Sequence, residues 1–106
     1  MVINEKVKKV IGESAFLVLV TVNPDGSPHP IVAGKGEVEG DSVVFGIYKM
    51  ELTQRNISVN GSAQVLGAIM AEGSPLGFRL NGSAAVRESA AGKQLVFTAA
   101  SADTLI

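Results

Sequence analysis

The chain has 106 residues, of which 46% are hydrophobic, 18% charged and 5% aromatic, and its formal net charge is −1. This size and composition predict a single globular domain spanning 1–106 and exclude a disordered chain. The slightly negative net charge argues against nucleic-acid binding through overall electrostatic attraction. The sequence has no cysteine, which excludes disulfides and thiolate metal sites and fits a reducing compartment.

The N-terminal segment and the apolar runs bear on the cellular location of the protein. The first ten residues mix charges and lack the apolar core of a signal peptide. The longest apolar run, at 15–22, is too short to span a bilayer as a helix. We therefore expect a cytoplasmic protein. High apolar content with few charges also indicates that part of the surface is buried against a partner.

The N-terminal part of the chain is predicted to form a helix and then a strand. Ile3 and Val7 recur at helical spacing within 3–12, and Asn4 is suited to cap this amphipathic helix. The run AFLVLVTV at 15–22 is continuously apolar. Such a run predicts a strand that is buried on both faces.

A turn and two further strands are predicted next. The segment NPDGSPHP at 23–30 is a turn signal, because proline presets φ and glycine supplies a positive φ. Its last two prolines restrict the following strand to a sheet edge or a bulge. The glycine-rich stretch 30–40 and the segment SVVFGIY at 42–48 are the two predicted strands.

The second half of the chain is predicted to contain one helix and three strands. The helix covers 50–58, and the strands cover 62–73, 78–88 and 95–100. Asn81-Gly82, in the middle of a strand, indicates a β-bulge. About six short strands predict a mainly-β protein, a small barrel, in which the helix at 50–58 closes one end.

Residues with obvious catalytic chemistry are scarce. His29 is the one histidine, so no second histidine or cysteine joins it in a metal site. The segment GKGEVEG at 34–40 lacks the lysine-serine ending of a phosphate loop. The sequence therefore predicts no metal site and assigns no catalytic residue.

The polar stretch KMELTQRNISVNG at 49–61 is the best candidate for a binding site. As a helix it would present free backbone N–H groups, Lys49 and the Thr53 hydroxyl at its first turn, which is the chemistry of an anion site. Arg55 adds a fork of donors that suits phosphate oxygens. Glu51 competes for the same helix dipole, and the alternative is a plain connector helix.

Four segments, TVNPDGSPHP, MELTQRNI, GFRLNGSAAV and ASADTLI, follow one another in an order that covers nearly the whole chain. In this order the sequence resembles the pyridoxamine 5'-phosphate oxidase-like split-barrel flavoproteins, and most of all their small FMN-binding members. The resemblance implies a six-stranded antiparallel split barrel and a homodimer with two FMN sites at the subunit interface. It implies electron transfer or FMN-dependent oxidoreduction of a small molecule.

The resemblance also implies which residues bind the cofactor. Thr53 matches the family's phosphate-binding threonine at the start of the helix. Tyr48, Lys49 and Met50 match the segment that runs along the edge of the flavin ring.

Other positions of the resemblance lie elsewhere in the chain. Ala33 and Gly34 match second-strand positions that meet the phosphate and the ribityl chain. Asn56 matches a structural asparagine of the helix. The apolar end, Leu105-Ile106, matches a tail that packs over the flavin of the partner.

Two departures from the family pattern keep an alternative open. Leu52 stands where many members have a basic residue before the threonine, and small residues occupy 32–34 in place of polar, aromatic or basic ones. Each missing hydrogen bond removes about 1–3 kcal/mol of binding. The alternative is a non-enzymatic split-barrel module for haem, a deazaflavin or another nucleotide, and a weaker one is a purely structural dimer.

Overall fold

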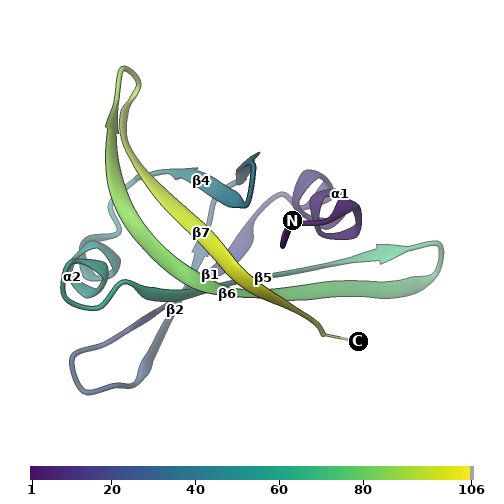
Figure 1. Cartoon of the computed structure of the whole chain (residues 1–106), viewed down its shortest axis with the longest axis horizontal. Helices are drawn as coiled ribbons and strands as arrows, with labels where there is room; N and C mark the ends of the chain where they lie inside the picture. Colours follow the sequence, from purple (N-terminus) through teal and green to yellow (C-terminus); the bar gives the residue numbers. More distant parts are fainter. Residues whose placement is uncertain (106) are drawn as a thin grey trace.

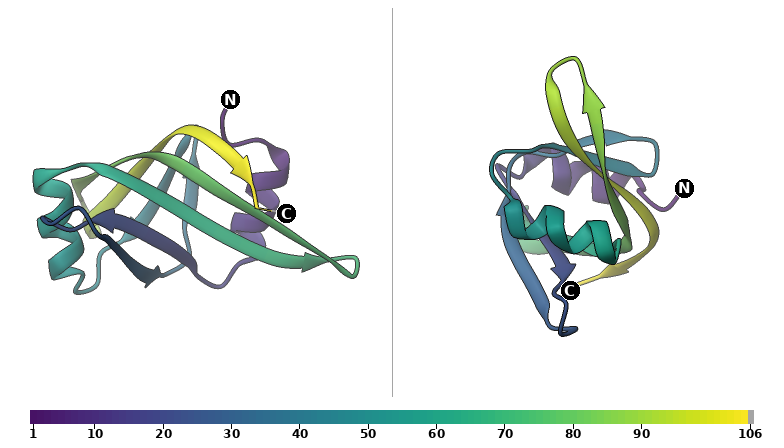
Figure 2. Two further views of the ribbon diagram at one scale, coloured as in Figure 1. Left: turned by 90° about the horizontal axis from the view of Figure 1, so that it is seen from below. Right: turned by 90° about the vertical axis from the view of Figure 1, so that its left-hand side faces the viewer.

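The computed structural model describes residues 1–105. Its helices are α1 (Glu5–Glu13) and α2 (Glu51–Val59), and its strands are β1 (Leu17–Val22), β2 (Pro28–Ala33), β3 (Glu37–Glu39), β4 (Ser42–Gly46), β5 (Ser62–Ala71), β6 (Ser74–Ser89) and β7 (Gly92–Thr104). The strands form one antiparallel sheet in the order β2-β1-β5-β6-β7-β4-β3. The sheet curls into a barrel with α1 and α2 at opposite ends (Figure 1, Figure 2). The predicted antiparallel barrel is confirmed.

The described chain has seven strands where six were predicted, because the stretch 30–40 breaks at Gly34–Gly36 into β2 and β3. These two strands are the opposite edges of the sheet, so the break is the crossing from one edge to the other. Gly36 is required there, since a Cβ at this position would lie 2.6 Å from Val43 Cγ1 and 3.1 Å from Phe45 Cε1. β2 carries both prolines at an edge, as predicted.

The first strand differs from its prediction in burial. In β1 the residues Leu17, Leu19 and Thr21 face the core, and the alternating Val18, Val20 and Val22 are only partly covered. The prediction of burial on both faces is therefore wrong for the described chain. A continuously apolar strand with one half-covered face leaves an apolar stripe on the outside of the barrel.

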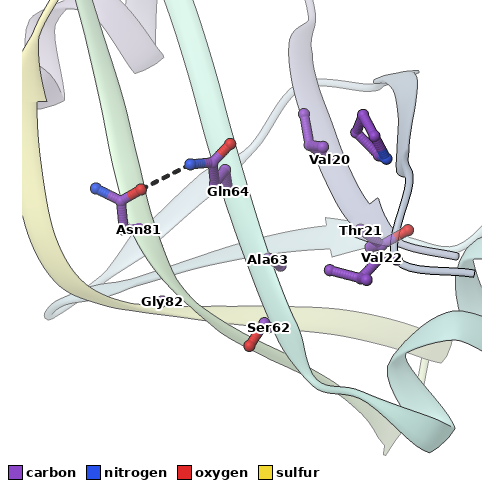
Figure 3. Close-up of a pocket in the computed structure, with 10 residues that line it drawn as sticks. Val20, Thr21, Val22, Ser62, Ala63, Gln64, Asn81 and Gly82 are labelled. Atoms are coloured by element: carbon purple, nitrogen blue, oxygen red, sulfur yellow. Dashed lines mark hydrogen bonds between the residues drawn. The ribbon is translucent and has the colours of Figure 1, made fainter.

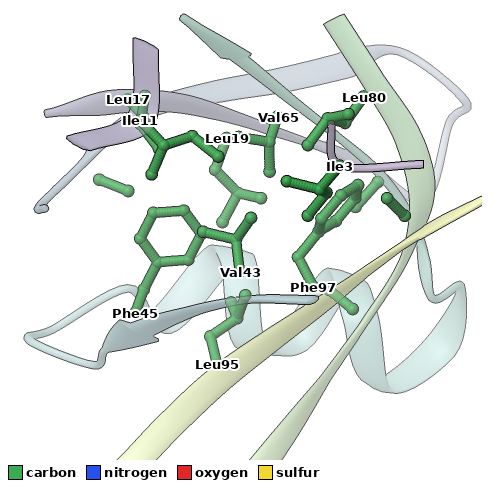
Figure 4. Packing of buried hydrophobic residues seen from close by; sticks show 14 of the residues in the cluster. Ile3, Ile11, Leu17, Leu19, Val43, Phe45, Val65, Leu80, Leu95 and Phe97 are labelled. Atoms are coloured by element: carbon green, nitrogen blue, oxygen red, sulfur yellow. The ribbon is translucent and has the colours of Figure 1, made fainter. Parts of the chain in front are cut away.

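Buried side chains of α1 and of the inner faces of the strands form the core. Figure 4 shows how its central residues pack together. Phe45, Leu80 and Phe97 are each at most 1% exposed and fill its centre. Helix α1 starts where the sequence predicted, since Asn4 Oδ1 accepts a hydrogen bond of 3.0 Å from the Val7 N–H. Its buried side chains include Val7, from the predicted apolar face.

The long strands β6 and β7 pair in antiparallel fashion, and their pairing contains one irregularity. Their register shifts between Asn81 and Gly82, which confirms the predicted bulge. β7 continues to Thr104, so part of the segment expected as a tail pairs with β6. Ile106, expected to pack over a flavin, lies outside the described residues. No helix among the described residues is long and apolar enough to cross a membrane.

The N-terminus is tied to the β3–β4 turn by a carboxylate. The Ile3 N–H donates to Asp41 Oδ1 at 3.0 Å, and this bond and a second from the Val2 N–H hold the pKa of Asp41 below its ordinary value of 3.8. Because the folded pKa is lowered, the stabilisation is present above pH 3.8 and is lost as the pH falls through the folded pKa.

We expect a carboxyl NMR titration to give a midpoint below 3.8 for Asp41. In Asp41→Asn, which keeps the acceptor, stability should fall less steeply in acid. A midpoint at or above 3.8 would contradict the contact.

Candidate functional site

The segment that enters α2 has an unusual backbone. Lys49 and Met50 are consecutive non-glycine residues in the left-handed region, with φ of 65° and 58°. Each such residue costs roughly 1–2 kcal/mol relative to a right-handed conformation. Strain of this kind persists where the surrounding structure or a ligand requires it. The entry to α2 is therefore the first place to look for a site.

The first turn of α2 has no side chain to cap it. Met50 occupies the N-cap position and makes no side-chain hydrogen bond to the helix. The backbone N–H groups of Glu51, Leu52 and Thr53 have no acceptor within the helix. Open N–H groups at a helix start carry a partial positive charge, which suits a phosphate or carboxylate.

Thr53 adds a second observation at the same place. Its side chain is 1% exposed, and its Oγ1 is a buried polar atom with no hydrogen-bond partner among the described residues. A buried hydroxyl without a partner is rare and costs about 1–3 kcal/mol. The uncapped turn and this hydroxyl are donors that fit a phosphate group.

Charge at the entry to α2 is mixed. Lys49 Nζ lies 5.5 Å from the centre of the Tyr48 ring, and both side chains are exposed. Glu51 is an exposed acid in the first turn and opposes an anion there. Leu52 is 51% exposed, whereas Ile57 of the same helix is 9% exposed and packs in the core.

The strain at Lys49 can be measured without a ligand. Lys49→Gly and Lys49→Ala remove the same charge, but only glycine adopts a positive φ at no steric cost. We expect Lys49→Gly to unfold at higher denaturant than Lys49→Ala, by about 1 kcal/mol in free energy. Equal stability of the two variants would mean that residue 49 is not held in the left-handed conformation.

The other predicted cofactor residues fall into two places. Ala33 ends β2, is 2% exposed and pairs with Leu17. Gly34, the next residue, is exposed, and a Cβ there would meet nothing within 4 Å. The backbone at Gly34 therefore has open space beside it that a ligand can use.

Arg55 does not join the helix start. It follows Thr53 by two residues, so the two side chains point about 200° apart around the helix axis. Its Nε and Nη2 donate to Asn56 Oδ1 at 3.3 and 2.9 Å. The helical period alone indicates that Thr53 and Arg55 point to different sides of α2.

A pocket of about 370 Å³ lies on the barrel beside the β1–β2 turn (Figure 3). Val20, Val22 and Pro28 give it an apolar side, and none of the predicted cofactor residues lines it. Gln64 and Asn81, on neighbouring strands, point to one another there, with a hydrogen bond of 2.8 Å from Gln64 Nε2 to Asn81 Oδ1. The sequence analysis missed Gln64, which only the register of β5 on β6 could have placed opposite Asn81.

Residues 3–104 match the family model described as pyridoxamine 5'-phosphate oxidase. The chain belongs to the pyridoxamine 5'-phosphate oxidase family. The resemblance seen in the sequence is confirmed at the level of this family. No curated protein matches the chain.

Solved structures share the fold of this family member at low sequence identity. A variant of HupZ from Group A Streptococcus has a TM-score of 0.82 and 16% identity, with 99% of this chain and 100% of that chain covered. An FMN-binding protein from Syntrophomonas wolfei has a TM-score of 0.81 and 15% identity, covering 96% and 85%. A heme binding protein from Mycobacterium smegmatis has a TM-score of 0.74 and 15% identity, covering 94% of this chain and 56% of that one.

Residues 1–105 of this pyridoxamine 5'-phosphate oxidase family member contain no cluster of potential metal ligands. The structure has no group of three or more His, Cys, Asp or Glu side chains that could hold an ion within that range. His29 lies on the edge strand β2, opposite Thr21.

Proposed function

We propose that the protein binds FMN and works as a flavoprotein, in electron transfer or in the oxidoreduction of a small molecule. The observation that carries the proposal is the entry to α2, where an uncapped first turn and the buried, unpartnered Thr53 hydroxyl occur together. Family membership and the fold shared with an FMN-binding protein support it.

The phosphate of FMN is assigned to the first turn of α2. The backbone N–H groups of the turn would hold it first, and Lys49 would add a positive charge. Because Thr53 is 1% exposed, its hydroxyl would reach the phosphate after a local rearrangement of the helix entry. Release of the strain at Lys49 and Met50 would favour such a rearrangement.

The remaining cofactor residues would follow the length of FMN. Tyr48, Lys49 and Met50 would run along the edge of the flavin ring. Ala33 and Gly34 would approach the phosphate and the ribityl chain, and the open space at Gly34 would let a ligand lie against bare backbone.

Bound FMN would supply the electron chemistry, and the chain would supply binding and orientation. The seven proposed or predicted cofactor residues include no carboxylate and no histidine that could act as acid or base. Tyr48 and Lys49 could exchange a proton, but both side chains are exposed, which favours electron transfer or an undemanding oxidation over acid–base catalysis.

A homodimer would complete the FMN site. Val18 and Leu66 are only partly buried on the outer face of the barrel, and Val32, which pairs with Val18, is 66% exposed. This apolar stripe is a surface that a second copy of the chain would cover. We also propose that residues 1–106 act as one domain in the cytoplasm.

A binding module for haem, a deazaflavin or another nucleotide is the second candidate. Leu52, half-exposed beside the proposed phosphate position, provides no charge for FMN. The fold shared with a heme binding protein supports this alternative.

The test is a visible absorption spectrum of purified protein before and after incubation with excess FMN and desalting. We expect about one retained flavin per chain, and a higher midpoint of thermal unfolding with FMN than without it. A parallel incubation with haemin is the control. A colourless protein after FMN, with retained haemin, would replace the first candidate by the second.

A further inference from the structure

We propose that the groove around the β1–β2 turn is a second ligand site, which binds a small organic carboxylate through Arg55. Of the residues predicted for the cofactor only Arg55 takes part in it, and Arg55 lies away from the start of α2. The pocket of about 370 Å³ described above meets a second pocket of about 190 Å³, because Val22 and Gly26 line both. Arg55 lines the second pocket, together with Asn23 and Asn60.

The guanidinium group of Arg55 is held in place from one side. Asn56 is 2% exposed, and its Nδ2 donates to Thr21 Oγ1 at 3.1 Å and to Asn23 Oδ1 at 3.0 Å. The oxygen of Asn56 must therefore face Arg55, where it accepts from Nε and Nη2. Since a guanidinium group has five N–H donors, the outer edge formed by Nη1 and Nη2 stays available as a fork.

No carboxylate of the described chain occupies that fork. The ion pairs among residues 1–105 involve Arg79 and Arg87 but not Arg55. The C-terminal end of α2 opposes an anion with about half a negative charge, whereas Arg55 carries a full positive charge. The balance at this pocket therefore favours an anion.

The asparagine side chains around the fork also present donors. Asn23 Oδ1 accepts from Asn56, and Asn60 Oδ1 accepts from the Ser62 N–H at 3.0 Å. Each amide oxygen is thus bonded within the protein. Asn23 Nδ2 also donates to Ser27 Oγ at 3.1 Å, so one N–H of Asn23 and the amide N–H groups of Asn60 remain for a ligand. These donors and the Arg55 fork favour a carboxylate, which offers two acceptor oxygens and a charge, over a neutral amide.

The adjoining larger pocket decides which kind of anion fits. Val20, Val22 and Pro28 form an apolar side next to the position of Arg55. Burial of apolar ligand surface there stabilises the complex. An organic acid with a short apolar body uses both pockets, whereas inorganic phosphate uses only the smaller one.

Isothermal titration calorimetry with 3-phenylpropionate tests the site, and its uncharged amide is the matched control ligand. We expect the carboxylate to bind with a Kd of about 1 mM or tighter, and the amide and inorganic phosphate to bind at least about tenfold more weakly. Arg55→Gln should weaken the carboxylate at least about tenfold, and Arg87→Gln, at an exposed arginine outside both pockets, should not.

Asn60→Asp is the second variant, in case loss of the Arg55–Asn56 bonds loosens the fold. Aspartate keeps an acceptor for the Ser62 N–H and replaces the donor by a negative charge, so the fold is kept and the anion is repelled. We expect a loss of carboxylate affinity of at least about tenfold. Equal binding of acid and amide, no binding of the acid, or unchanged affinity in Asn60→Asp would overturn the proposal.

Discussion

Replacing Gly82 with alanine is expected to lower the free energy of unfolding by about 3 kcal/mol. A Cβ at this position would collide with the backbone carbonyl oxygen of Thr98 and lie 3.1 Å from Ala99 Cα. Backbone atoms of a paired strand cannot move aside as a flexible side chain can, so β6 and β7 would have to separate at the bulge. Urea denaturation measures the effect.

Gly46→Ala is the matched control, because Gly46 also lies in a strand but a Cβ there would meet nothing within 4 Å. Its stability should be unchanged or higher by up to about 1 kcal/mol. If both glycines tolerate alanine equally, β6 does not approach β7 closely at residue 82. The close approach of β6 to β7 at residue 82 also shapes the groove, because Gly82 and its neighbour Asn81 both line the larger pocket.

Local signals in the sequence predicted most of the elements. Asn4 and the apolar spacing placed α1, and Asn81-Gly82 placed the bulge. The break at Gly34–Gly36 was missed, because its cause is the packing of Gly36 against Val43 and Phe45. Residues that come later in the chain determine where the stretch 30–40 breaks into two strands. The composition of the stretch itself does not reveal the break.

The candidate site was predictable in part. The sequence placed Thr53 and Lys49 at a helix start, and the structure has α2 begin there. The left-handed pair of Lys49 and Met50 was not predictable, since neither residue type favours a positive φ. The separate direction of Arg55 follows from helical periodicity, whereas the partner that fixes it, Asn56, depends on contacts with β1.

The double change Thr53→Val and Lys49→Ala is expected to weaken FMN binding at least about tenfold, or 1.4 kcal/mol. Valine keeps the shape of threonine but removes the hydroxyl that would donate to the phosphate, and alanine removes the neighbouring charge. Thr53→Val alone should raise the stability of the cofactor-free protein by about 1 kcal/mol, because the Thr53 hydroxyl is buried without a partner. Fluorescence titration with FMN and urea denaturation measure the two effects.

Opposite signs in these two measurements distinguish a binding group from a structural one. A hydroxyl that stabilised the fold would lower stability on removal, and its loss would affect every ligand. Ser58→Ala, on the exposed side of α2, is the control and should change neither quantity appreciably. An unchanged FMN affinity in the double variant would mean that the phosphate lies away from the start of α2. Haem has no phosphate group but carries two propionate carboxylates, so an affinity for haemin that survives both changes would mean that these carboxylates lie away from the start of α2. The phosphate site and the alternative ligand are thereby tested with the same variants.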